Sequence, residues 1–178
     1  MPAPTPRDAP APRDPALREA IESLAAMPAA LEALYRSFPA GAALWKPRSW
    51  EGIPGETFSA LEQLCHLRDI ELDGYQVRIR RLLDEERPLL VSLDGYALAR
   101  ERSYATSNAV EALAAFQAAR AQTLASLAQV GESHWARSGV FEGYGRVTLA
   151  SVVHYLASHD QQHLACLRWL LGKYAAET

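Results

Sequence analysis

The sequence lacks the features that identify several large classes of protein. Its two cysteines, Cys65 and Cys166, are too few for a disulfide framework, so we expect a cytoplasmic protein. A formal net charge of −3 gives no sign of a surface for nucleic acid or anionic lipid. No apolar run approaches the roughly 18 residues of a membrane span, and the start of the chain lacks the apolar core of a secretory signal. The sequence therefore predicts neither a nucleic-acid nor a membrane partner, and we expect a small-molecule substrate.

β-Branched residues are also sparse, whereas alanine and leucine dominate, and this balance indicates helices. Most prolines fall in residues 1–15, which we interpret as a flexible tail because such a density of proline cannot sustain a helix. Residues 16–174 have the length of a single domain. The periodic segments predict four long helices, over about 15–37, 59–86, 108–131 and 149–172. The expected fold is an all-α four-helix bundle.

Capping residues mark three of the helix starts. Ser59 with Glu62 three residues later is typical of a capping box, in which each side chain accepts a hydrogen bond from the other residue's backbone amide. Asn108 with Glu111 predicts a second box, and Thr148 is a favourable N-cap for the last helix. Pro28 is expected to kink or split the first helix. The segments between helices should be loops, with one short helix around residues 97–104.

Three of the five histidines lie in the last predicted helix, within "HYLASHDQQHLACLRWLL" (154–171). At about 100° per residue, His163 falls on the leucine stripe of this helix, and His159 lies one turn earlier beside the stripe. Side chains on adjacent turns are roughly 5–6 Å apart, close enough for both to bind one ion. His154 projects from the opposite side. The alternative is that the two histidines are partly exposed and form ordinary hydrogen bonds.

His66 is the third candidate and lies in the second predicted helix, in "EQLCHLRDIELDGY". Asp69 and Asp73 follow it one and two turns later. Such carboxylates can accept the second N–H of an imidazole that binds a metal. Equally, they can mark a solvated face on which His66 itself lies. The periodicity of this helix leaves both interpretations open.

Two segments resemble the DinB-like superfamily, which includes metal-dependent thiol S-transferases. "FSALEQLCHLRDIE" is similar to its aromatic-Ser…His-Leu-x-Asp pattern, with Phe58 where tryptophan is commoner. "GRVTLASVVHYLASHDQQHLACLRWLL" is similar to its Thr-Leu…His-x-x-x-His pattern. The resemblance covers roughly residues 17–173. It implies a four-helix bundle, often a homodimer, that holds a divalent metal such as zinc or nickel on His66, His159 and His163.

Three neutral nitrogen ligands leave an open position on such an ion, where the pKa of a bound water or thiol falls. The resemblance favours a thiol S-transferase, in which a low-molecular-weight thiol as cosubstrate attacks a small electrophile. A metal-dependent hydrolase and a non-catalytic, stress-related metal-binding protein are the alternatives. A carboxylate over the open position would favour the hydrolase. A deep cleft with basic and aromatic walls would favour the transferase, and a site sealed by hydrophobic side chains would favour the third.

Several further residues have expected roles around this site. Asp69 is predicted to accept a hydrogen bond from a ligating imidazole, or to be a fourth ligand. Asp160 is expected at the surface or as a cap. Both cysteines are expected in the core, with metal binding by Cys166 as an alternative. The candidates for substrate contact are Trp45, Trp50, Arg100, Arg102, Tyr104 and Tyr144.

Overall fold

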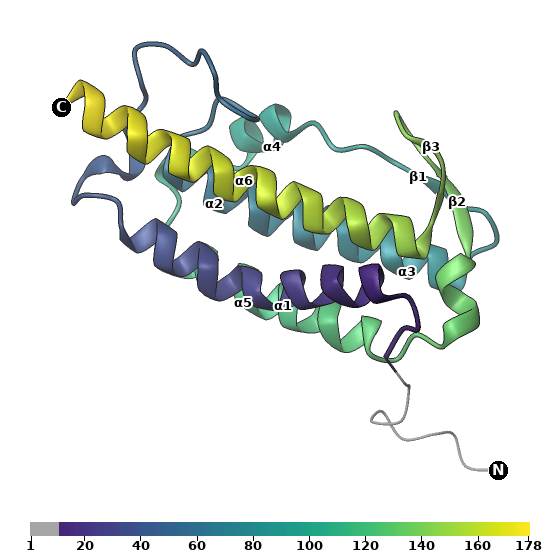
Figure 1. Cartoon of the computed structure of the whole chain (residues 1–178). Helices are drawn as coiled ribbons and strands as arrows, with labels where there is room; N and C mark the ends of the chain where they lie inside the picture. The colour runs from purple at the N-terminus through teal and green to yellow at the C-terminus, as the bar shows by residue number, and fades with distance from the viewer. Residues whose placement is uncertain (1–10) are drawn as a thin grey trace.

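The computed structural model describes residues 11–178 (Figure 1). Four helices form a bundle. One of them is continuous over α2 (Ala60–Asp69), the turn η2 (Ile70–Tyr75) and α3 (Gln76–Asp84). The other three are α1 (Pro15–Arg36), α5 (Ala109–Leu127) and α6 (Leu149–Glu177). The turn η2 is π-helical. The predicted four-helix bundle is therefore confirmed. Within the described chain, no helix combines the length and apolarity that crossing a membrane requires.

The predicted caps set the starts of the helices that carry the histidines. Ser59 Oγ accepts from the Glu62 amide, and Glu62 Oε2 accepts from the Ser59 amide at 2.7 Å. Thr148 caps α6 and forms a capping box with Ser151. Asn108 caps α5 through two backbone amides, but the predicted box with Glu111 is not completed. These caps satisfy backbone donors that no helical carbonyl can reach.

Tertiary packing carries two helices past residues that favour a helix end. The helix α1 continues through Pro28 without the split that was one of its two expected outcomes, and its side chains Leu24, Met27 and Leu31 on either side of the proline are buried. The helix α6 does not end at Gly172 but continues to Glu177. The Tyr174 ring lies edge-on against another aromatic ring, that of Trp45, at 5.2 Å. Burial of apolar surface thus outweighs the local preference of proline and glycine to end a helix.

A small sheet occupies segments that we predicted to be loops. Its strands run in the order β1 (Leu89–Leu90), β2 (Ser138–Phe141) and β3 (Gly145–Thr148). Strand β1 is parallel to β2, and β2 is antiparallel to β3. The sheet leads directly into α6. The strands have at most four residues, too few for alternation of apolar side chains to reveal them.

The expected short helix is present as α4 (Gly95–Glu101).

The predicted flexible tail lies mostly outside the described residues. Its described end is held against the bundle, because the Arg13 amide donates to Glu132 Oε2 at 3.2 Å. Arg18 Nη1 also donates to the Pro12 carbonyl at 2.7 Å. Residues 11–14 therefore extend the packed part of the chain beyond the predicted start of the domain.

A buried ionic cluster joins three of the four helices of the bundle. Arg120 of α5 donates to Glu71 of η2 at 2.9 and 3.1 Å, and to Asp160 of α6 at 2.5 and 3.1 Å. Thr123 Oγ1 also donates to Glu71. The three charged residues are at most 1% exposed, so the expectation that Asp160 lies at the surface is wrong. Burial raises the pKa of Asp160 to about 6, although Arg120 opposes this shift.

Replacing Arg120 tests how strongly this cluster holds the bundle. Arg120→Met leaves two buried carboxylates without a counter-charge, so we expect the free energy of unfolding to fall by about 3–5 kcal/mol. Urea denaturation followed by circular dichroism measures it. The control Arg36→Met removes an exposed pair with Glu32 and should change stability little. Equal small effects of both substitutions would show that the cluster does not hold the helices together.

Candidate metal centre

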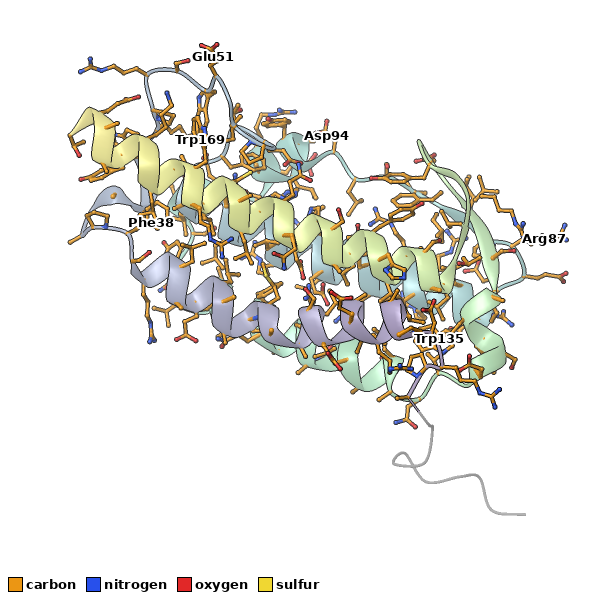
Figure 2. The ribbon with its side chains drawn as sticks, viewed as in Figure 1. Phe38, Glu51, Arg87, Asp94, Trp135 and Trp169 are labelled. Carbon is orange, nitrogen blue, oxygen red and sulfur yellow. The ribbon has the colours of Figure 1, made fainter. Side chains whose placement is uncertain are left out.

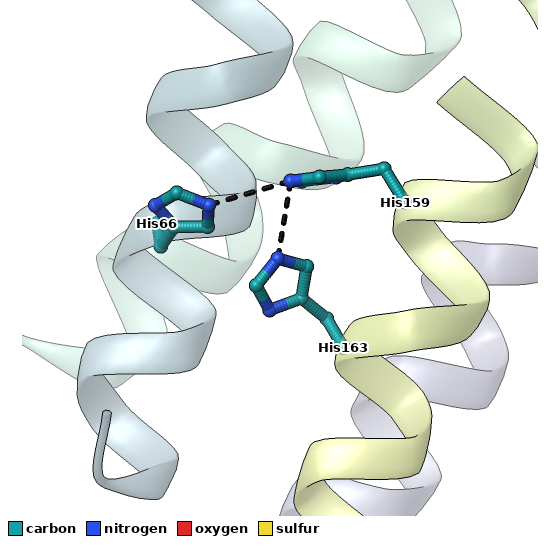
Figure 3. A group of neighbouring side chains, drawn as sticks. All are labelled: His66, His159 and His163. Carbon is teal, nitrogen blue, oxygen red and sulfur yellow. Dashed lines mark hydrogen bonds between the residues drawn. The ribbon is translucent and has the colours of Figure 1, made fainter. Parts of the chain in front are cut away.

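The three histidines singled out in the sequence converge inside the bundle (Figure 3). His66 projects from α2, and His159 and His163 project from successive turns of α6. The His159 Nε2 atom lies 3.3 Å from His66 Nε2 and 3.1 Å from His163 Nε2. His66 and His163 are at most 2% exposed, and His159 is half-buried. Three imidazole nitrogens thus face one point that bulk water barely reaches.

This arrangement fits a divalent ion. With bonds of about 2.0–2.1 Å in tetrahedral geometry, the nitrogens around zinc are roughly 3.3–3.4 Å apart. The two short Nε2–Nε2 separations here are close to that value. Lone pairs of neutral imidazoles that face one another repel unless a proton or a cation lies between them. The donor set and its spacing therefore suit a metal with three protein ligands.

Gln63 fixes the orientation of one imidazole and was not anticipated from the sequence. His163 Nδ1 donates a hydrogen bond to Gln63 Oε1, which leaves the lone pair on Nε2, facing the other two histidines. The amide nitrogen of Gln63 in turn donates to the Glu56 carbonyl at 3.1 Å. Gln63 lies one turn before His66 in α2, so a single helix face supplies both residues. Within residues 11–178, Nδ1 of His66 and Nδ1 of His159 have no partner.

The electrostatic environment keeps all three imidazoles neutral. Burial lowers the pKa of His66, although the nearby carboxylates of Glu56 and Asp69 oppose it. Burial, with smaller contributions from His66, Arg120 and Arg78, lowers the pKa of His159 to about 3. Burial also places the pKa of His163 well below its usual value. Neutral imidazole is the form that binds a metal, so no proton has to be displaced near neutral pH.

Glu56, which no sequence pattern indicated, faces His66 and His163. Its Oε1 lies 4.0 Å from His66 Nε2, and its Oε2 lies 3.8 Å from His163 Nε2. Oε2 is shielded from solvent and has no hydrogen-bond partner among the described residues, although the side chain as a whole is 30% exposed. The preceding Gly55 lets the loop lie close to α6, because an added Cβ would lie 2.7 Å from Gln162 Nε2 and 3.0 Å from the Cys166 sulfur. No periodicity could reveal a glutamate in a loop rich in glycine and proline.

Asp69 does not make the predicted contact with an imidazole. Its carboxylate accepts from Arg68 Nε at 2.6 Å and from the Tyr104 hydroxyl at 2.7 Å, and it pairs with Arg102 at 3.1 Å. These donors occupy Asp69, while His66 Nδ1 has no partner within the described chain. Asp69 therefore holds α2 to the segment around Tyr104. Two of the predicted substrate contacts, Arg102 and Tyr104, belong to this ionic group instead.

Neither cysteine belongs to the histidine group, although Cys166 lies beside Gln63 and Glu56, and the loop tryptophans pack elsewhere. Cys65 and Cys166 are buried and free, as expected of core residues, and burial raises the pKa of Cys166 to about 11. Trp45 and Trp50 pack on aromatic rings of α6, where the loop that carries Glu51 lies over Trp169 (Figure 2). The tryptophans therefore attach the loop that carries Glu56 to the bundle, and their predicted substrate role has no support.

Comparisons with known proteins agree with this architecture. A model of the DinB superfamily matches residues 23–167, a range that includes all three histidines. Among solved structures, the chain is similar to YfiT from Bacillus subtilis, described as a probable metal-dependent hydrolase with an unusual four-helix bundle topology. The identity is 19%, the alignment covers 94% of each chain, and the TM-score is 0.79. At this identity the likeness shows the fold. No curated protein matches the chain.

The geometry predicts that the purified chain binds about one divalent ion. His66→Ala, His159→Ala and His163→Ala should each lose most of it, because two nitrogens hold an ion far less tightly than three. Elemental analysis after gel filtration gives the metal content. His154→Ala, a control on α6 outside the histidine group, should retain the metal. Equal metal in all four variants would contradict this assignment.

Removal of the Gln63 side-chain amide tests its support of His163. We expect Gln63→Leu to bind the ion 10–100-fold more weakly, roughly the effect of losing a hydrogen bond to a ligating imidazole. Competition with a chromogenic chelator measures the affinity. Gln117→Leu removes an amide bonded to Glu32, in a contact between α1 and α5, and should leave the affinity unchanged. The role of Gln63 is wrong if the two variants bind the ion equally well.

Proposed function

The chain belongs to the DinB superfamily, and from the geometry of its histidine site we propose that it is a divalent-metal-dependent hydrolase of small esters or amides. The carboxylate of Glu56, 3.8 and 4.0 Å from two of the imidazole nitrogens, carries this proposal. A carboxylate in this place favours hydrolysis, because it can accept a proton from the attacking water. The description of YfiT as a probable metal-dependent hydrolase supports the same assignment. We propose zinc or nickel as the ion, because imidazole nitrogen suits both.

Each residue of the site has a role that follows from its contacts. When bound, a divalent ion supplies Lewis acidity that lowers the pKa of water and polarises a carbonyl group. Glu56 accepts the proton of the attacking water on its unpartnered Oε2 and returns that proton to the leaving group. Gln63 holds the His163 ring through one end of its amide and the Glu56 backbone through the other. One side chain therefore sets the position of both the ligand and the base.

Transfer of a low-molecular-weight thiol is the second candidate. A basic and aromatic wall beside the site favours it, since the Arg78 guanidinium packs on the rings of Tyr75 and Phe141 at 5.1 and 4.5 Å. In that reaction Glu56 accepts the proton of the thiol instead of the proton of water. A purely metal-binding role has less support, because the site is faced by a carboxylate and is not closed by hydrophobic side chains alone.

The role of Glu56 is tested by Glu56→Gln, which keeps the shape of the side chain and removes its basicity. With the metal-loaded protein and a panel of nitrophenyl esters and nitroanilides, we expect kcat to fall 10²–10⁴-fold, the usual contribution of a general base. Metal content should stay unchanged. Glu51→Gln, an exposed change in the same loop, is the matched control and should keep full activity.

A parallel assay adds glutathione, bacillithiol or mycothiol and an alkyl halide or epoxide. Turnover that requires a thiol, with no ester or amide hydrolysis, would replace the first candidate by the second. If Glu56→Gln hydrolyses the panel at the wild-type rate, Glu56 is not the base.

A further inference from the structure

Arg78 is a buried arginine without a carboxylate partner. It lies on α3 and is 6% exposed, yet within the described residues no Asp or Glu oxygen lies within 4.0 Å of its guanidinium. Arg120 is buried to a similar degree and pairs with two carboxylates. A guanidinium with little access to water and no counter-charge is costly. Arg78 is therefore a candidate to bind an anion that supplies this charge.

The hydrogen bonds of Arg78 leave part of its guanidinium free. Nε and Nη2 both donate to a single acceptor, the Val91 carbonyl, at 3.3 and 2.9 Å. Nη1 has no partner in the described part of the chain. It lies against Gly74, where an added Cβ would approach to 2.9 Å, so the absence of a side chain at this position makes room for it. The rings of Tyr75 and Phe141 stabilise the charge from their faces but accept none of its N–H groups.

A single aromatic ring, that of Tyr75, connects Arg78 to the histidine site. The Tyr75 ring, 5.1 Å from the Arg78 guanidinium carbon, is also 5.9 Å from the His159 ring, so one aromatic side chain contacts both. The Tyr75 hydroxyl forms no hydrogen bond within residues 11–178. Two side chains next to His159 therefore carry a donor without an acceptor in the described chain, Nη1 of Arg78 and the hydroxyl of Tyr75.

We propose that Arg78 binds an oxyanion group of the substrate, a carboxylate or a phosphate, with the Tyr75 hydroxyl as a second donor. The inference rests on the proposed function, because it places the substrate between Arg78 and the histidines. It narrows the substrate class to small esters, amides or electrophiles that carry a negative charge. The planar guanidinium offers its free N–H groups to two oxygens of one anion, which a lysine at this position would not do.

Binding of small anions to the full-length protein tests this without any turnover. Sodium acetate and inorganic phosphate are titrated at constant ionic strength, and the melting temperature gives the dissociation constant. We expect a saturable rise with at least one of the two anions, and the anion that produces it identifies the group recognised. Arg78→Gln should weaken binding at least about tenfold, and Arg78→Lys should weaken it less. Arg80→Gln, an exposed change two residues away with the same loss of charge, should bind as the wild type does.

The inference is overturned if neither anion binds the wild-type chain saturably, or if Arg78→Gln binds as tightly as the wild type. Far-UV circular dichroism shows whether each variant is folded. Should Arg78→Gln be unfolded, Tyr75→Phe, which removes only a hydroxyl, must weaken binding several-fold for the proposal to stand. Loss of hydrolysis in every assay with anion binding intact would count against the hydrolase assignment and not against Arg78.

Discussion

The structure depends on the requirement that buried polar groups find partners. The buried side chain of Arg120 finds its partners in Glu71 and Asp160. Because these three residues belong to α5, η2 and α6, their contacts set how these helices pack. Asp160 directly follows His159, so the contact that holds it also fixes the rotation of α6 about its axis. Glu71 follows His66 by five residues on the neighbouring helix. The ionic cluster therefore brings the histidines of two helices to a common point.

The fold was largely predictable, because the signals that define it are local. Ser59 and Thr148 begin helices through bonds within one turn, and the leucine stripes recur at the helical period. The errors arose where distant residues decide the outcome. Gly172 lies inside α6 because Trp45, far away in sequence, packs on the next turn. The sheet exists because residues 89–90 find a partner strand about 50 residues later, which no short pattern records.

The residues of the candidate site were likewise predictable where the signal is local and not where a second helix or a loop decides. His159 and His163 could be found because both lie on one helix at a spacing that lets their side chains bind one ion. A helical wheel describes one helix, however, and says nothing about its neighbour. It could not show that Asp160 faces Arg120, or that Tyr104 and Arg68 occupy Asp69. Glu56 and Gln63 escaped prediction for a related reason. A loop positions Glu56, and the role of Gln63 depends on its hydrogen bond with the His163 ring.

The two buried arginines differ in whether other groups of the protein balance their charge. Arg120 donates to two carboxylates and to a backbone carbonyl, so its charge is balanced inside the protein. Arg78 has one backbone carbonyl and two aromatic faces, which stabilise it without using all its donors. The same contrast holds between Glu71, whose oxygens are both bonded, and Glu56, whose Oε2 has no donor within the described chain. The unbalanced member of each pair is the one beside the histidines. A centre with a carboxylate and a guanidinium that both keep free hydrogen-bonding atoms is suited to a reaction in which the carboxylate accepts a proton from the nucleophile and the guanidinium binds a negatively charged substrate.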